Sequence, residues 1–275
     1  MKNLMARYRY SLILLRELVK TDFKLRYQGS ILGIAWSVLK PLMLFVVMYL
    51  VFVEFLRFTD GTHTYPIVLL LGIALWGFFA EATGVGMQSI VARGDLLRKV
   101  NFPRYIVVVS AICSSMISLL INMGIVIVAL ALYVIFGQAN FSWDLLWLPL
   151  NLLEFIAIAL GIALFLSALF VKFRDITHIW DVILQILFYA MPVIYPLTLA
   201  AFTKYPIIAK LMMMNPVAQT IQDVRHNLIS PTVPTVWSVT GHWFWGLIPI
   251  AIAIGVLALG IWFFRRNSKH FAEDL

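Results

Sequence analysis

Three acidic side chains fall inside long apolar stretches of this 275-residue chain: Glu81, Glu154 and Asp181. A charge at membrane depth is costly and usually faces protein or water, so such a residue can carry a proton or contact a polar cargo. Asp181 can pair with His178, which lies one helical turn away. Glu81 is therefore the strongest candidate of the three for a functional contact or a contact between helices.

Most other chemistry is missing from the sequence. It contains no G-x-x-x-x-G-K-[ST] phosphate loop, so nothing in it predicts binding of ATP phosphates. Its five histidines are scattered without metal-ligand spacing, and the single cysteine, Cys113, cannot form an internal disulfide. No nucleophile motif is present. We therefore expect no cofactor and no covalent catalysis in this chain, so active transport would take its energy from a partner or an ion gradient.

The composition predicts that a lipid bilayer surrounds most of the chain. Hydrophobic residues make up 62%, charged residues only 12%, and the mean hydropathy is +0.94. A helix needs about 20 mostly apolar residues to cross the hydrocarbon core. The sequence thus predicts an all-α integral membrane protein with one transmembrane domain over residues 1–275, in which residues 1–30 are interfacial, 31–264 hold the spans and 265–275 form a tail. The six predicted spans are Leu39–Leu56, Pro66–Ile90, Tyr105–Phe136, Leu145–Val171, Ile179–Leu197 and Trp243–Phe264.

The distribution of basic residues predicts the orientation. Sixteen of the 21 lysines and arginines lie in the N-terminal segment, the loop 91–104, the link 172–175 and the C-terminal tail. The opposite loops hold four. Since positive charge is retained on the cytoplasmic side, both termini are predicted to be cytoplasmic in a multi-pass protein of the bacterial plasma membrane. The net charge of +8 is then explained without nucleic acid.

The N-terminal segment predicts a helix on the membrane surface, followed by a sharp turn into the bilayer. In LILLRELVKTDFKLRY, apolar residues recur at helical spacing and basic residues fall four apart on another face. The next stretch, RYQGSILGIAWSVLKPL, contains Gly29 and Gly33, which suit a tight corner. Pro41 is tolerated if it opens the first span, where its missing N–H costs nothing. Trp36 and Lys40 are typical of headgroup depth.

The segment Thr198–His242 is too apolar for an ordinary loop and too broken by prolines for a seventh span. We expect two short re-entrant helices that dip into the outer leaflet between the fifth and sixth spans, provided that their turns are buried in protein. A plain surface loop is the alternative.

Several motifs in order resemble the permease subunits of ABC exporters for lipid-linked polysaccharides such as O-antigen, teichoic acid and capsule. The motif residues Tyr27, Ser30, Leu32, Gly33, Trp36, Pro41 and Leu42 resemble the start of those permeases. LRKVNFPR (Leu97–Arg104), KFRDI (Lys172–Ile176), PVIYP (Pro192–Pro196) and MNP (Met214–Pro216) follow in the same order. The resemblance covers essentially the whole chain, and the corner residues that it singles out are Tyr27, Ser30, Gly33, Trp36 and Pro41.

The resemblance implies a homodimer that binds two copies of a separate cytoplasmic ATPase, which would hold the ATP and Mg. It also implies that RGDLLRKVNFPR is a short coupling helix docked on that ATPase, with Asp95 near its start and basic residues near its end. The predicted coupling residues are Asp95, Leu96, Leu97, Arg98, Lys99, Arg104, Arg174 and Asp175. Positive-inside charges and a local Arg174–Asp175 ion pair are the simpler explanation for the charged members.

Aromatic residues are the candidates for a glycan path, because sugar C–H faces pack on aromatic rings while hydroxyls need polar partners. The predicted path residues are Trp76, Phe78, Phe79, Glu81, Phe188, Tyr189 and Tyr195, although most aromatics in such a chain face lipid or other helices. Prolines break the fifth span near its outer end, where freed carbonyls need partners. The predicted outer gate comprises Pro192, Pro196, Asn215 and Pro216.

Two alternatives remain open. The first is an exporter of drugs or lipids from the same superfamily, which the motifs at Tyr27–Leu42 and Pro192–Pro196 disfavour. The second is an ion-coupled flippase in which Glu81, Glu154 and Asp181 carry protons. The three acids lie at different depths without an evident relay, which argues against it.

Overall fold

The computed structural model describes residues 2–27, 30–31, 33–100, 102–138, 143–269 and 271, and this part of the chain is helical with connecting loops and no strand. Five helices in it are long and apolar enough to cross a membrane. They are α2 (Trp36–Met48) continued by the π-helix η2 (Tyr49–Phe55), α3 (Tyr65–Ala92), α5 (Tyr105–Ile135), α6 (Leu148–Lys172) preceded by the 3-10 helix η3 (Trp143–Trp147), and α12 (Leu247–Asn267) preceded by η4 (Trp243–Gly246). Five of the six predicted spans are thus present as long helices.

The predicted fifth span is a shorter helix, α7 (Ile176–Ala190), with 15 residues. At 1.5 Å per residue it is about 22 Å long, which is less than the roughly 30 Å of a hydrocarbon core. It stops because Pro192 follows, and Met191 before that proline adopts an extended conformation with ψ 154°. The count of six spans therefore stays a prediction.

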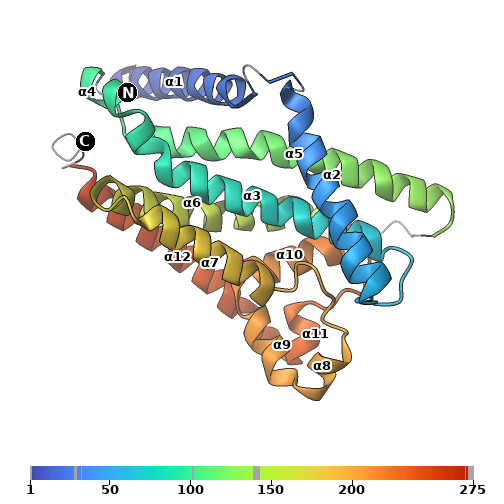
Figure 1. Cartoon of the computed structure of the whole chain (residues 1–275). Helices are drawn as coiled ribbons and strands as arrows, with labels where there is room; N and C mark the ends of the chain where they lie inside the picture. The colour runs from blue at the N-terminus through green and yellow to red at the C-terminus, as the bar shows by residue number, and fades with distance from the viewer. Residues whose placement is uncertain are drawn as a thin grey trace.

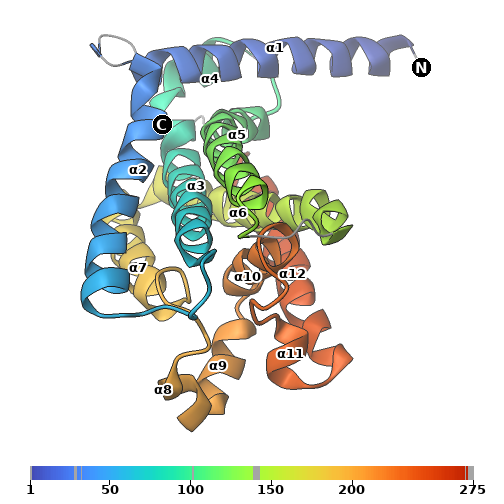
Figure 2. The same ribbon diagram turned by 90° about the vertical axis from the view of Figure 1, so that its right-hand side faces the viewer.

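The two ends of the helix bundle differ (Figures 1 and 2). At one end, α1 (Lys2–Tyr27) lies across the bundle and packs on α5. The short α4 (Gly94–Lys99), the α6–α7 link and the C-terminal end of α12 lie at the same end. Because these elements carry most of the basic residues, we call it the basic end. At the far end lie α8 (Ala200–Lys204), α9 (Pro206–Met213) and α11 (Val236–Thr240). The predicted surface helix and coupling helix are both present as helices.

The core forms around α3, which packs between α5 and α6. Phe78 and Phe79 of α3 contact Phe155 of α6 with ring centroids 5.7 and 6.0 Å apart, and the Trp180 indole N–H of α7 donates to Thr83 Oγ1 at 3.1 Å. The backbones of α6 and α12 approach each other closely at Gly161 and Gly260. A Cβ on Gly260 would meet the Gly161 carbonyl oxygen at 2.1 Å, so only glycine fits there.

The segment between α7 and α12 contains four short helices where the sequence predicted two. The longest, α10 (Pro216–Leu228), is buried on nearly every side, and it packs against α6, α12 and α3. Its start is capped by Asn215, whose side-chain oxygen accepts from the Val217 N–H at 2.9 Å, and Pro216 occupies the first helical position. The surface-loop alternative is therefore wrong for α10, which is an internal helix.

Candidate functional site

A cavity of about 580 Å³ lies between α2, α3, α5 and α7, and it combines charged, aromatic and apolar walls. Lys40 of α2, Glu81 of α3 and Asp181 of α7 supply its charges. Its remaining lining residues are Trp36, Ser37, Pro41, Leu44, Ile73, Ala74, Gly77, Phe78, Ala80, Ser118, Leu119, Asn122 and Leu184. The structure thus brings together two corner residues and two of the three predicted intramembrane acids, which are far apart in sequence.

Pro41 does not open the first span, as the sequence predicted, but lies inside α2, five residues after its first residue, Trp36. An internal proline has no N–H to donate to the carbonyl four residues earlier, here that of Ser37. Asn122 of α5 supplies the donor instead, with Nδ2 3.3 Å from the Ser37 carbonyl oxygen and 2.8 Å from that of Ser118. Asn122 therefore pairs the carbonyl that Pro41 leaves without its helical donor. It is 8% exposed and lines the cavity.

The corner before α2 has the geometry that its glycine predicted. Gly33 adopts φ +49°, in the left-handed region that other residues rarely take, and its N–H donates to the Ser30 carbonyl at 3.2 Å. Trp36 is 43% exposed at the start of α2. Gly29, Leu32 and the side chain of Tyr27 lie outside the described residues, so their predicted contribution to the corner stays a prediction.

The short helix α4 packs its leucines against the protein and exposes its charged residues. Leu96 and Leu97 pack against the core, while Asp95, Arg98 and Lys99 are exposed. Asp95 lies in the first turn and the two basic residues in the last, the favourable sense for the helix dipole. The apolar pair anchors α4 and leaves its charged face accessible.

An ion pair joins α4 to the surface helix. Arg93, which caps α4, donates through Nη2 to the Asp22 carboxylate of α1 and through Nη1 to Ser110 Oγ of α5 at 3.1 Å. Both charged side chains are mostly buried, and burial lowers the pKa of Arg93. Breaking a buried pair is much costlier than breaking a surface pair. Arg93 therefore links α4 to both α1 and α5.

The other predicted coupling residues also lie at the basic end. Arg104 is 6.0 Å from the ring centroid of Phe271, and Arg174 is 5.2 Å from that of Phe170. Asp175 precedes α7 as its capping residue, without a side-chain capping hydrogen bond. These cations contact aromatic rings, an interaction that the sequence analysis did not consider for them.

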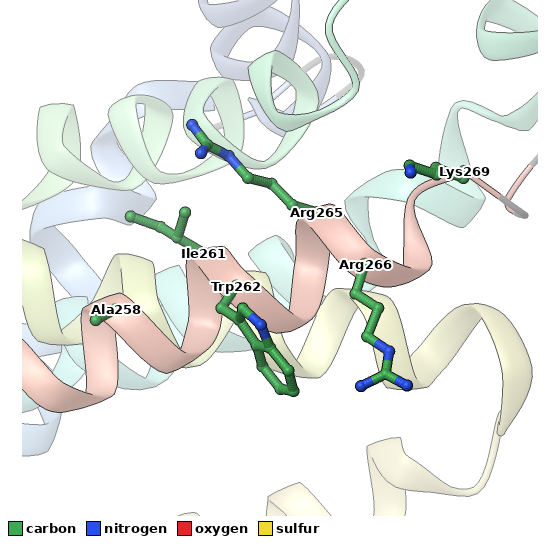
Figure 3. Close-up of a pocket in the computed structure, with 6 residues that line it drawn as sticks. All are labelled: Ala258, Ile261, Trp262, Arg265, Arg266 and Lys269. Carbon is green, nitrogen blue, oxygen red and sulfur yellow. The ribbon is translucent and has the colours of Figure 1, made fainter.

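A shallow pocket of about 590 Å³ lies at the basic end of α12. Figure 3 shows the residues that line it. Trp262 and Arg266 point to one side of the helix and Arg265 to the other, and the Arg266 guanidinium lies 5.6 Å from the Trp262 ring. A tryptophan beside arginines is typical of lipid headgroup depth. The basic end therefore has the character of a membrane interface.

The predicted path residues lie in different surroundings: some line the cavity or are exposed, and others are buried in the core. Phe78 lines the cavity, Tyr189 is 55% exposed on α7, and Phe188 contacts Trp76 with ring centroids 5.7 Å apart. Phe79 is fully buried against Phe155 and Trp180, so it faces the core in this conformation. Tyr195 donates to the Tyr189 carbonyl at 2.9 Å and stacks on Phe202.

Arg225 holds the broken end of α7, although the sequence indicated only that it is one of the four basic residues in the opposite loops. Arg225 of α10 is 2% exposed, and its two terminal nitrogens donate to the carbonyls of Pro192 and Val193, each at 2.5 Å. The hydroxyl of Tyr65 donates to the next carbonyl, that of Ile194, at 3.2 Å. Three successive carbonyls are therefore paired, as a backbone break at membrane depth requires.

Arg225 fits only because α3 has a glycine opposite it. A Cβ on Gly72 would lie 1.9 Å from Arg225 Nη2, and Arg225 Nε donates to the Val68 carbonyl of the same helix at 3.1 Å. Burial lowers the pKa of Arg225 to about 10, so the guanidinium keeps its proton at neutral pH. Among the predicted gate residues, Pro192 is thus tied to α3 and α10, Pro196 lines a small adjoining pocket with Arg225, and Asn215 and Pro216 start α10.

Long apolar helices, with α1 across one end and a cavity between α2, α3, α5 and α7, are the arrangement of a multi-pass membrane protein. A comparison with family models matches residues 13–229 to the ABC-2 type transporter membrane family. The chain belongs to this family of ABC transporter membrane subunits. Membership in the family implies a partner ATPase subunit.

Curated relatives agree with that assignment. The chain is 31% identical over 185 residues to the O-antigen export system permease protein RfbA of Myxococcus xanthus, a match over 67% of this chain and 69% of that protein. It is 24% identical over 266 residues to an O-antigen export system permease protein RfbA of Klebsiella pneumoniae, over 97% of this chain and 96% of the relative.

Proposed function

We propose that the chain exports a polyprenyl-linked cell-surface glycan across the bacterial inner membrane, as a homodimer with two copies of a separate ATPase that binds ATP and Mg. The two relatives are O-antigen export permeases, which favours O-antigen as the cargo. The observation that carries the proposal is the cavity in which Trp36 and Pro41 of the corner meet Lys40, Glu81 and Asp181. Its mixed walls suit a lipid-linked headgroup: carboxylates accept from sugar hydroxyls, an ammonium pairs with phosphate, and aromatic and aliphatic walls contact the lipid and sugar faces.

The exposed face of α7 supports the proposed dimer and a path along it. Asp181, Gln185 and Tyr189 are all exposed, and they follow one another at intervals of four residues, so they share one face of the helix. An acid and an amide are too costly to place against lipid tails, so this stripe faces protein or water. A second copy of the chain across a hydrated path satisfies that requirement.

The link between α4 and α1 supports coupling to an ATPase. Closure of the ATPase dimer against the exposed face of α4 would displace Arg93, and with it Asp22 and Ser110. In this mechanism α1 and α5 move together, and the cavity next to α5 changes shape. The positive-inside rule, applied to the basic end, supports an orientation with α4 in the cytoplasm.

Isolation of the complex tests the proposal. Gentle detergent extraction from the native host, followed by mass spectrometry, should recover a soluble ATPase at two copies per two copies of this chain. Asp181→Ala and Trp36→Ala should assemble normally but lose export, whereas Trp237→Ala, an exposed tryptophan on α11, should export normally. Recovery of the chain without an ATPase, together with transport driven by a proton gradient, would favour the ion-coupled alternative.

A further inference from the structure

The contact between α6 and α10 contains two carboxyl groups that share a buried amide. Asn227 Nδ2 of α10 donates to Asn151 Oδ1 of α6 at 2.9 Å. Glu154 lies one helical turn from Asn151 on α6, and Asp223 and Gln219 lie one and two turns from Asn227 on α10. Gln219 is 3% exposed and Asp223 is 9% exposed. Gln219 Nε2 donates to Asp223 Oδ2, so one oxygen of that acid has its donor.

Three buried oxygens in this cluster have no donor in the described part of the chain. They are Glu154 Oε1, Gln219 Oε1 and Asp223 Oδ1. Buried polar atoms in folded proteins are nearly always paired, and two adjacent carboxylates without a cation are especially unfavourable. This part of the α6–α10 contact therefore has more acceptors than donors, and the missing component is a donor or a positive charge.

We propose that Glu154, Gln219 and Asp223 form a resident proton-binding site, which holds one proton between the two carboxyls and fixes α10 against α6. The proton removes one of the two negative charges. It also turns one carboxyl into an O–H donor, for which Gln219 Oε1 and the other carboxyl are available acceptors. A single proton thus accounts for both the charge and the unpaired acceptors.

A metal ion is less well supported by the same atoms. Within the described residues, no group of three His, Cys, Asp or Glu side chains could hold one. A neutral contact next to this site, between Asn227 Nδ2 and Asn151 Oδ1 at 2.9 Å, continues the polar α6–α10 interface. The interface is therefore built from side-chain hydrogen bonds, and a proton completes it without further ligands.

The groups around the site determine its pH dependence. Burial raises the pKa of Asp223 to about 6, although Gln219 and His226 lower it. The His226 ring is held by the Val233 carbonyl at 2.9 Å. The elements packed against α10 carry further titratable or charged groups: Glu154 and Lys172 on α6, Asp144 on η3, Lys210 on α9, Tyr65 and Glu81 on α3, and Arg265 and Arg266 on α12, besides Arg225 on α10 itself.

The sign of the effect follows from the raised pKa. Between about pH 4 and pH 6 the folded state keeps a proton that the unfolded chain has lost. Raising the pH through this window therefore lowers the free energy of unfolding. Glu154→Gln replaces the proposed acid by a permanent donor, so it should flatten that dependence.

Infrared spectroscopy of the purified chain in lipid nanodiscs tests the site directly. The wild type should show the C=O stretch of a protonated carboxyl below about pH 6, which disappears as the pH is raised above that value. Glu154→Gln and Asp223→Asn should each remove this titration, and Glu17→Gln, a change of an exposed acid on α1, should leave it intact. Absence of the band in the wild type, or a band indifferent to both substitutions, would overturn the proposal.

A salt titration on the wild type alone covers the case in which the variants do not fold. The band should be the same in sodium, potassium and choline chloride, because a proton occupies the site. Loss of the band on adding sodium or potassium at constant pH would show a metal cation there instead, and would also overturn the proposal.

Discussion

Replacing Arg225 by methionine should strongly destabilise the chain, because methionine keeps most of the length but none of the five donors. The carbonyls of Pro192 and Val193 would then lose the partners that they have in the fold. A buried acceptor without a partner costs about 1–3 kcal/mol, so the two together cost roughly 2–6 kcal/mol. At about 2 °C per kcal/mol for a chain of this size, the midpoint of thermal unfolding should fall by roughly 4–12 °C.

The assay is thermal unfolding in detergent, followed by the loss of the monodisperse peak in size-exclusion chromatography. Lys210→Met is the matched control, since Lys210 is an exposed cation on α9, and it should shift the midpoint by less than about 1 °C. Gly72→Ala should also destabilise, because its Cβ would displace the guanidinium. If Arg225→Met has the same midpoint of thermal unfolding as Lys210→Met, the Arg225 guanidinium does not hold the broken end of α7 and the reasoning fails.

Further substitutions test the other contacts. Asn122→Leu should lower the free energy of unfolding by about 1–3 kcal/mol, measured by thermal unfolding. Adding Pro41→Ala should recover most of this loss, because the N–H of an alanine at position 41 can donate to the Ser37 carbonyl; no recovery would contradict the Asn122–Ser37 hydrogen bond. Asp22→Arg and Arg93→Asp should each uncouple ATP hydrolysis from export, and the double exchange should restore export in part; a double variant no better than the singles would refute a direct pair. Gly33→Val should cost about 1–2 kcal/mol because of its positive φ, and export measured in cells should fall while dimers still form; normal export would remove the corner from the mechanism.

The sequence was sufficient where a pattern is local. Helical periodicity with basic residues four apart predicted α1, the charge order in RGDLLRKVNFPR predicted α4, and Gly33 predicted a left-handed corner. Apolar length predicted the five long helices to within a few residues. The short features depend on residues within a few helical turns of each other, and the long helices depend on one uninterrupted apolar stretch of about 20 residues.

The sequence was insufficient where a backbone group finds its partner far along the chain. Local rules placed Pro41 at the start of a helix, because they could not show that Asn122, 81 positions away, pairs with the freed carbonyl. Arg225 was counted only as a basic residue of an outer loop, whereas it is buried against α3 and the end of α7. A basic residue in an otherwise apolar outer segment that follows a proline break is the signal that could have suggested it.

The central claim is that ATP hydrolysis by a partner drives a lipid-linked glycan through this chain. The most direct measurement uses proteoliposomes that contain the chain, its co-purified ATPase and a fluorescent polyprenyl-linked oligosaccharide, with a lectin to detect the glycan on the far side. The account predicts ATP-dependent appearance of glycan, abolished by Asp181→Ala in the cavity and unaffected when a proton gradient is dissipated. Transport that proceeds without the ATPase and stops when the proton gradient is dissipated would contradict it.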